Sequence, residues 1–154
     1  MSPEQFKAAL SRWATGVTVI TTRSRAGELA GLTASSFSSL SLDPPLVLFC
    51  LAHSSTTKPS FDAADGFAVN ILSEGQKELS GRFAQLGGDK FQGVAWRPGL
   101  RGIPLLDHAL ATLECRIAQV HPGGDHSIVV GAVEQIHCGD EKPLVYYRGA
   151  YHAL

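Results

Sequence analysis

The sequence is short of charge, and no part of it concentrates charge of one sign. Charged residues make up 18% of the 154 residues, and 13 basic side chains nearly balance 14 acidic ones, which gives a formal net charge of −1. The basic residues occur singly along the chain, so no stretch could follow a line of phosphates. We therefore expect no nucleic-acid partner.

Long apolar runs and a set of paired cysteines are also missing. No stretch approaches the roughly 18 apolar residues of a membrane-spanning helix, and the N-terminal MSPEQFKAAL lacks the basic-then-apolar order of a signal peptide. Cys50, Cys115 and Cys138 are odd in number, widely spaced and set among apolar or strand-forming residues, which favours buried thiols over disulfides or a zinc ribbon. We expect a soluble cytoplasmic protein with no membrane partner.

The common signatures of phosphate binding and nucleophilic catalysis are absent: there is no G-x-G-x-x-G after a strand, no Walker loop and no G-x-S-x-G. His121, Asp125 and His126 cross a tight turn, where the consecutive Asp125 and His126 should point to opposite sides. Cys50 and His53 lie three apart on a predicted strand and should also face opposite ways. We therefore predict neither a metal site nor a nucleophilic pair at these positions.

What the sequence contains is mainly the pattern of β-strands. Apolar, β-branched or alternating stretches bounded by turn residues predict strands within 16–22, from 31 onward, and within 44–53, 66–72, 108–121, 126–136 and 143–154. The continuous apolar run over 46–51 predicts a central strand that is buried on both faces. The alternation over 112–117 predicts a strand with one buried face.

Only short helices separate these strands. Ser2 and Gln5 predict a capped helix at the N-terminus, and its apolar stripe consists of Phe6, Leu10 and Trp13. Helical signals recur near Pro59 and over 75–86, where the apolar spacing is that of Leu79, Phe83 and Leu86. The stretch 89–107 has three glycines, two prolines and no sustained period, so it is predicted to be a surface loop.

The fold class follows from the connections between the strands. Parallel strands need crossover helices longer than this chain offers, whereas its turn sequences suit hairpins. The sequence therefore predicts a mainly β protein, an antiparallel β-barrel with short peripheral helices, and its length predicts one domain over 1–154.

Hydroxyl side chains gather at the ends of two predicted strands. One group lies in GLTASSFSSLSLDPPLV at Thr33, Ser35 and Ser36, and the other follows the next apolar strand at 54–57 and ends in Lys58. These residues are either solvent-facing turn residues or the lining of a groove for a phosphorylated aromatic cofactor, in which Lys58 would supply charge. A helix beginning near Pro59 would add its dipole.

The order of the motifs along the chain favours the second interpretation. From Trp13 to Tyr151 the motifs run GVTVIT, GLTASSFSSLSLDPPLV, SST, FAVNIL, Q-x-x-L-x-x-RF, KF-x-G, G-x-P-L-L, LEC, GDHSIVVGAV and PL-x-Y-x-x-G-x-Y. This collinear series resembles the flavin reductase-like family, whose members form an FMN-binding split barrel. The resemblance implies an antiparallel split β-barrel and an NAD(P)H-dependent reductase of FMN or FAD. Such proteins are usually homodimers and often the small partner of a flavin-dependent monooxygenase.

The resemblance also implies the site residues. The residues that it assigns to the flavin are Thr33, Ala34, Ser35, Ser36, Ser54, Ser55, Thr57, Asn70, Arg82, Phe83 and Tyr151. His126 matches the histidine of the GDH motif and is expected near the nicotinamide as the catalytic residue. Lys58 is also predicted to contact the phosphate, although many relatives have an apolar residue at the matching position. Structural roles stay open for four of them: a turn cap for Asn70, a surface ion pair for Arg82 and packing for Phe83 and Tyr151.

The reaction that the resemblance implies needs few protein groups. Hydride passes from nicotinamide C4 to flavin N5, and the protein stacks and aligns the two rings. Two other functions remain open: a fixed FMN that passes electrons to a corrinoid or a metal centre, and a non-enzymatic flavin or haem carrier. No recognisable ribose-binding fingerprint distinguishes NADH from NADPH.

Overall fold

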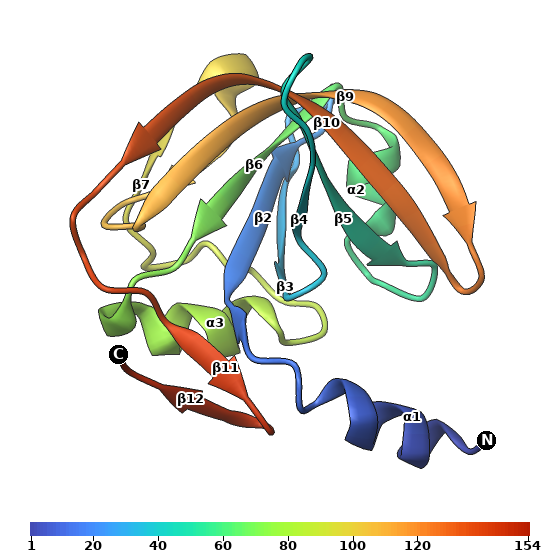
Figure 1. The fold of residues 1–154 in the computed structure, drawn as a ribbon. Helices are drawn as coiled ribbons and strands as arrows, with labels where there is room; N and C mark the ends of the chain where they lie inside the picture. The colour runs from blue at the N-terminus through green and yellow to red at the C-terminus, as the bar shows by residue number, and fades with distance from the viewer.

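A curled antiparallel sheet forms the body of the protein in the computed structural model, which describes residues 1–154 (Figure 1). Seven strands follow the order β3-β2-β6-β9-β10-β5-β4, so β3 and β4 are the open edges. Their bounds are β2 Thr18–Arg23, β3 Leu29–Ala34, β4 Ser38–Ser41, β5 Leu46–Ala52, β6 Gly66–Ile71, β9 Ala111–Gly123 and β10 His126–Cys138. The predicted mainly β, antiparallel fold class is confirmed, and the sheet does not close.

Shorter elements surround this sheet. Three strands form a small sheet at the end from which the N-terminal helix projects: β1 Thr15–Gly16, β11 Val145–Tyr147 and β12 Ala150–His152 (Figure 1). The helices are α1 Pro3–Leu10, α2 Lys58–Asp62 and α3 Lys77–Phe83, with 3₁₀ turns η1 Glu74–Gln76 and η2 Leu100–Gly102. None of these helices is long and apolar enough to cross a membrane.

Several local predictions are confirmed. Ser2 and Gln5 form the capping box of α1, in which the Gln5 amide N–H donates to Ser2 Oγ at 3.1 Å. Hairpins join β2 to β3 and β9 to β10 in antiparallel register, as the turn residues predict. The C-terminal stretch differs from its prediction, since it forms the two short strands β11 and β12 around a turn with Gly149 at φ +76°.

The prediction for β5 as a central strand buried on both faces is wrong. Val47, Phe49 and Leu51 are buried, while the residues between them are only half-buried. The strand lies next to the edge strand β4, one of its faces packs into the core, and Cys50 and Ala52 on the other face line a cavity described below. Because every residue over 46–51 is apolar, the sequence has no alternation that would distinguish the buried face of the strand from the half-buried one.

The prediction of a loop over 89–107 is wrong for its second half. Strands β7 Trp96–Pro98 and β8 Pro104–Leu106 pair across η2, and Ile103, Leu105 and Leu106 are at most 3% exposed. Because this hairpin covers the outer face of the sheet, Thr112 and Glu114 of β9 are buried too, against the prediction of one buried face. The glycines and prolines of this stretch led to the prediction of a loop, but such residues occur in the tight turns of a packed hairpin as well.

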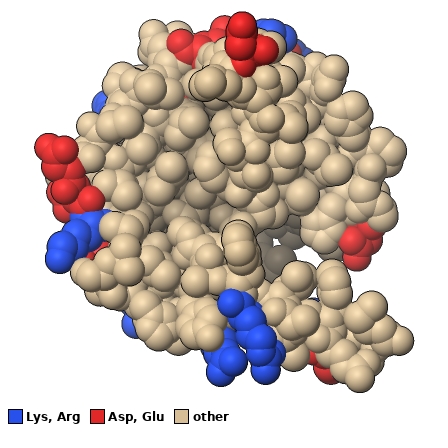
Figure 2. Space-filling view, viewed as in Figure 1, with Lys and Arg blue, Asp and Glu red and all other residues tan.

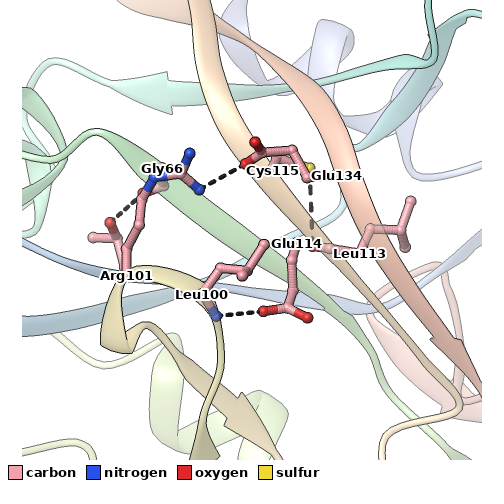
Figure 3. A network of polar contacts seen from close by, with 8 residues as sticks. Gly66, Leu100, Arg101, Leu113, Glu114, Cys115 and Glu134 are labelled. Atoms are coloured by element: carbon pink, nitrogen blue, oxygen red, sulfur yellow. Dashed lines mark hydrogen bonds and ion pairs between the residues drawn. The ribbon is translucent and has the colours of Figure 1, made fainter.

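Glu114 shows how the hairpin is held on the sheet. Figure 3 shows its carboxylate accepting the amide N–H of Leu100, at 2.7 Å. His137 Nε2 lies 3.2 Å from the other carboxylate oxygen. A Cβ at Gly99 would meet Glu114 Oε1, so a larger residue there would displace this carboxylate. The buried carboxylate therefore has partners that offset its desolvation.

The remaining differences concern α3 and the cysteines. Helix α3 ends at Phe83, and Leu86 lies beyond it with its side chain exposed. Cys115 is buried as predicted, and burial raises the pKa of its thiol to about 12. The prediction of buried thiols is wrong for the other two cysteines: Cys50 of β5 is half-buried and lines a cavity, and Cys138 is exposed at the end of β10.

Asn70 of β6 ties three strands together inside the core. Its side-chain Nδ2 donates to the carbonyl oxygen of Val19 and to Thr21 Oγ1, both at 3.0 Å. Its Oδ1 accepts the amide N–H of Leu106 at 2.9 Å. The residue is fully buried, so these contacts satisfy polar groups that water cannot reach.

We predict that Asn70→Ala lowers the free energy of unfolding by roughly 2 to 4 kcal/mol, because it leaves the buried Leu106 amide without an acceptor. Urea unfolding followed by circular dichroism measures the change. Gln135→Ala, at an exposed position of β10, is the control and should shift stability by less than about 0.5 kcal/mol. Unchanged stability together with lost flavin affinity would instead make Asn70 a cofactor ligand.

Candidate functional site

A cavity of about 440 Å³ lies where the end of β3, the segment after β5 and the end of α3 meet. The residues from the predicted site that line it are Thr33, Ala34, Ser35, Ser36, Ser54, Ser55, Phe83 and His126. The fold thus brings together four segments that are far apart in the sequence. Its further lining residues include Thr56 and Lys90.

The β3 side of the cavity is fixed by hydrogen bonds within the protein. Thr33 Oγ1 donates to the carbonyl oxygen of Ser80 in α3 at 2.6 Å. Ser36 Oγ accepts the amide N–H of Cys50 at 3.0 Å and so ties the end of β3 to β5. Ser35 is exposed and its hydroxyl has no partner in the protein. Thr33 and Ser36 therefore position this edge, and Ser35 is the hydroxyl left for a ligand.

In the segment after β5, too, some hydroxyls bond within the protein and others do not. Ser55 Oγ and Thr57 Oγ1 are 2.7 Å apart and bond to each other, and Thr57 is only 7% exposed. Thr57 does not line the 440 Å³ cavity, whereas Ser54 and Thr56 do, and their exposed hydroxyls make no bond within the protein. The inner pair shapes the turn, and the outer pair is available to a ligand.

Lys58 and Arg82 do not lie on this cavity. Lys58 Nζ forms an ion pair with Asp62 Oδ2 at 2.7 Å, one helical turn along α2. Arg82 donates to the carbonyl oxygen of Gln92 and lines a separate cavity of about 850 Å³ on another side of α3. Neighbouring helical residues are about 100° apart around the axis, so Arg82 and Phe83 point to different sides of α3.

Asn70 and Tyr151 also lie elsewhere. Asn70 belongs to the core network described above. The Tyr151 hydroxyl is 2.6 Å from Ser80 Oγ, and its ring packs against Tyr146 with centroids 5.4 Å apart. Through Ser80, Tyr151 supports the helix that carries Phe83, so its contacts hold the small C-terminal sheet against the wall of the cavity.

His126 stands at the first position of β10, opposite Ala52 of β5. Its Nδ1 is 2.6 Å from Asp125 Oδ1, so the expectation that these two side chains diverge is wrong. The hydrogen bond to His126 holds the pKa of the Asp125 carboxyl below its ordinary value. A carboxylate on Nδ1 favours the tautomer that leaves Nε2 as an acceptor, and the residue lines the cavity.

Lys90 is the cavity residue that sequence analysis missed. Its Nζ donates to the carbonyl oxygens of Gly31 in β3 and Phe83 in α3, at 3.2 and 3.3 Å. No carboxylate pairs with it, and burial lowers the pKa of its ammonium. The motif KF-x-G contains this lysine, but a single lysine in an aperiodic stretch gives no signal that it turns inward.

The arrangement suits a polar planar ligand with an anionic group. Unpaired hydroxyls of Ser35, Ser54 and Thr56 and the ammonium of Lys90 offer hydrogen bonds and charge. Phe83 supplies an apolar wall, and it is 1% exposed. These groups are of the kind that bind and orient a ligand.

Comparison with known proteins agrees with this description. The flavin reductase like domain family matches residues 10–154. The chain is 42% identical to the flavin-dependent monooxygenase reductase subunit HsaB of Mycobacterium tuberculosis, over all of this chain and 83% of that protein. It is 43% identical to the 4-hydroxyphenylacetate 3-monooxygenase reductase component of Thermus thermophilus, over 98% of this chain and 96% of that one.

A solved structure gives the same result. The NADH:FAD oxidoreductase SgcE6 of Streptomyces globisporus, solved in complex with NAD and FAD fragments, is 34% identical and superposes with a TM-score of 0.92. The match covers 99% of this chain and 94% of that one. The family match over nearly the whole length, the fold and the lined cavity lead to one conclusion: this chain belongs to the flavin reductase family.

Proposed function

We propose that this protein is an NAD(P)H-dependent flavin reductase that supplies reduced flavin to a partner monooxygenase. The proposal rests on the 440 Å³ cavity in a chain of this family. Four parts of the chain meet at this cavity: β3, the hydroxyl segment (residues 54–57), α3 and the start of β10. The two relatives named as reductase components support the monooxygenase partner. An odd number of cysteines, typical of a reducing compartment, supports a cytoplasmic location.

The residues present fit a flavin. Three cavity hydroxyls without protein partners, on Ser35, Ser54 and Thr56, match the many acceptors and donors of the ring edge and ribityl chain. Lys90 has no carboxylate partner and would face the phosphate. When bound, flavin accepts the hydride of a reduced nicotinamide, and the protein keeps the two rings stacked.

The protein's own part is therefore alignment. Thr33 and Ser36 are held by Ser80 and Cys50, so the cavity edge keeps its position when a ligand binds. His126, oriented by Asp125, would hold the carboxamide of the nicotinamide. Effective alignment of two reactants lowers a barrier without any general base.

We predict that the purified protein oxidises NADH or NADPH only when FMN, FAD or riboflavin is added, because the flavin is a substrate. The assay follows absorbance at the nicotinamide band with each flavin in excess. Oxidation without added flavin by protein that carries a bound flavin would favour the alternative of a fixed prosthetic group. No oxidation with any flavin and either nicotinamide would leave a carrier function.

We predict that His126→Ala raises the apparent KM for the nicotinamide by roughly 5- to 30-fold, the effect of one polar contact worth about 1 to 2 kcal/mol. Flavin affinity should stay within about twofold, since the imidazole is one of many cavity contacts. Stopped-flow reduction and flavin titration measure the two effects.

His121→Ala is the matched control, because this exposed histidine lies on the same hairpin and bonds only Gln119. This control variant should leave the apparent KM for the nicotinamide and the flavin affinity unchanged. A purely structural His126 would give a lower melting temperature and unaltered kinetics per folded molecule, which would contradict the role on the nicotinamide.

We also propose that the protein is a homodimer. Helix α1 has eight residues and none of them is buried, and its apolar side chains Phe6 and Leu10 are 52% and 56% exposed. Trp13, which follows the helix, is 77% exposed. An isolated helix this short is marginal in water, so it needs a packing surface that its own chain does not give. On the face shown in Figure 2, charged side chains form small separate groups with wide uncharged surface between them.

We expect sedimentation at micromolar concentration to show a dimer, and the double variant Phe6→Ser with Leu10→Ser to shift it toward monomer. Lys7→Ser is the control, since it removes a charge from the same helix and no apolar side chain. A wild-type monomer at these concentrations would contradict the dimer.

A further inference from the structure

The cavity of about 850 Å³ on the Arg82 side of α3 has no role in the flavin site proposed above. It is formed by η1, α3, residues 93–95, residues 107–108 and Glu141. Only Gln85 is shared with the 440 Å³ cavity. Its volume is within the roughly 300 to 1,000 Å³ of small-molecule sites. The chain therefore has room for a second small molecule on a different side of α3.

Three glycines keep this cavity open. Gly75, Gly81 and Gly93 all line it, and at each of them nothing lies within 4 Å of where a Cβ would be. Gly93 has φ +75°, which favours glycine, but Gly81 lies inside α3 and has no positive φ. Glycine at such a position makes a helix less stable than alanine does. What Gly81 provides is therefore open space, since a side chain there would extend into the cavity.

Opposite charges line the cavity without pairing. Glu78 and Arg82 are four residues apart on α3 with the acid nearer the N-terminus, which is the spacing and order that best suit a helical ion pair. Lys58 and Asp62 of α2 do pair at four residues. Arg82 instead donates to the carbonyl oxygen of Gln92, and neither Arg82 nor Glu78 forms an ion pair. Both charges are thus available to a ligand.

The two signs of charge lie toward different ends of the cavity. Glu141 also lacks an ion pair, and it lies beside η1 because the residue after it accepts an amide N–H of η1. Glu78 is close to η1 too, since α3 begins directly after that turn. Arg82 is one helical turn further along, about 6 Å from Glu78 along the axis. Leu79, between them in the sequence, supplies a half-buried apolar wall.

Gln76 adds a buried donor to the lining. It is only 8% exposed. Its Oε1 accepts the amide N–H of Ser73 at 3.0 Å, and its Nε2 donates one N–H to the carbonyl oxygen of Asp107 at 2.8 Å. The second N–H of this amide has no acceptor in the protein. Because buried donors are normally paired, this N–H favours a ligand with an acceptor in the cavity.

We propose that this cavity binds an elongated zwitterion of the size of a dipeptide. The ammonium group pairs with Glu78 and Glu141, the carboxylate pairs with Arg82, and the amide carbonyl between them accepts the free N–H of Gln76. Two extended residues span roughly 7 Å, which suits charges about 6 Å apart along α3. The proposal goes beyond the flavin reductase function and does not depend on it.

The dipeptide Ala-Leu is the probe, and isothermal titration measures its binding without turnover. We expect a dissociation constant below about 1 mM. N-acetyl-Ala-Leu lacks the ammonium and Ala-Leu amide lacks the carboxylate, so each should bind about tenfold more weakly or worse. No binding of Ala-Leu at about 10 mM contradicts the proposal, and so does equal binding of all three compounds.

Charge variants test which end of the ligand each residue holds. Arg82→Gln and Glu78→Gln should each weaken Ala-Leu by about tenfold. Arg82→Gln should not weaken the residual binding of Ala-Leu amide, and Glu78→Gln should not weaken that of N-acetyl-Ala-Leu. Lys77→Gln and Glu74→Gln are the controls, because they remove neighbouring charges that do not line the cavity, and they should change nothing. Equal loss of every compound in either cavity variant would overturn the assignment of the charges.

Gly81→Leu separates binding from folding. The leucine should fill the space beside α3 and abolish Ala-Leu binding, and it should raise the melting temperature by about 2 to 3 °C because it is the better helix former. Gly81→Ala, which adds one methyl group, keeps the test if the leucine variant does not fold. A folded Gly81→Leu protein that binds Ala-Leu as the wild type does would show that the site is elsewhere.

Competition with the cofactors distinguishes this site from the one proposed for flavin. Saturating FMN or NADH should leave the dissociation constant of Ala-Leu unchanged, because the 440 Å³ cavity lies on a different side of α3. Displacement of Ala-Leu by either compound would assign the cavity to the cofactors and contradict the proposal. Binding of Ala-Leu that Gly81→Leu abolishes supports the site even if the protein reduces no flavin.

Discussion

The long hairpin of β9 and β10 is the interaction on which the rest of the structure depends. Each strand has 13 residues, and β9 pairs with β6 on one side while β10 pairs with β5 on the other. The hairpin therefore joins the two halves of the open sheet, and its tip reaches beyond them (Figure 1). His126 at that tip lies opposite Ala52, so the pairing that completes the fold also delivers the histidine to the hydroxyl segment.

Register along this hairpin is protected by close packing. A Cβ on Gly131 would come within 2.4 Å of the Phe67 ring and 2.8 Å of the Cys115 Cβ. Phe67 in turn packs edge-on against Phe49 of β5, with centroids 5.0 Å apart. A shift of one residue would turn every side chain of β10 to the other face. The small residue at this crossing thus keeps the strand, and His126 with it, in place.

Much of the fold could be predicted because its information is local. The Ser2 capping box and the β9–β10 turn are read from adjacent residues, and both are present as expected. The β7–β8 hairpin was missed because its stability comes from distant partners: Leu100 bonds Glu114, and Leu106 bonds Asn70. Composition alone does not show such contacts, since the partners lie 14 and 36 residues away.

The site shows the same division. The order of motifs led to Ser35 and Ser54, which line the cavity, but gave no sign of which lysine does. Lys58 could have been set aside from the sequence, because Asp62 stands four residues later on a predicted helix and such pairs bond across one turn. Lys90 could not have been found that way, since its two acceptors are carbonyl oxygens of Gly31 and Phe83, which every residue type possesses.

These contacts support the proposal that a chain with a net charge of −1 holds anionic ligands. A basic patch would attract phosphates from solution over a wide surface, whereas Lys90 lines a cavity and is fixed by β3 and α3. Thr33 joins the same two elements through Ser80. Movement of α3 relative to β3 would therefore displace Lys90, Thr33 and Phe83 together. In the proposed function, the alignment that hydride transfer requires would therefore depend on the packing of one short helix against one edge strand.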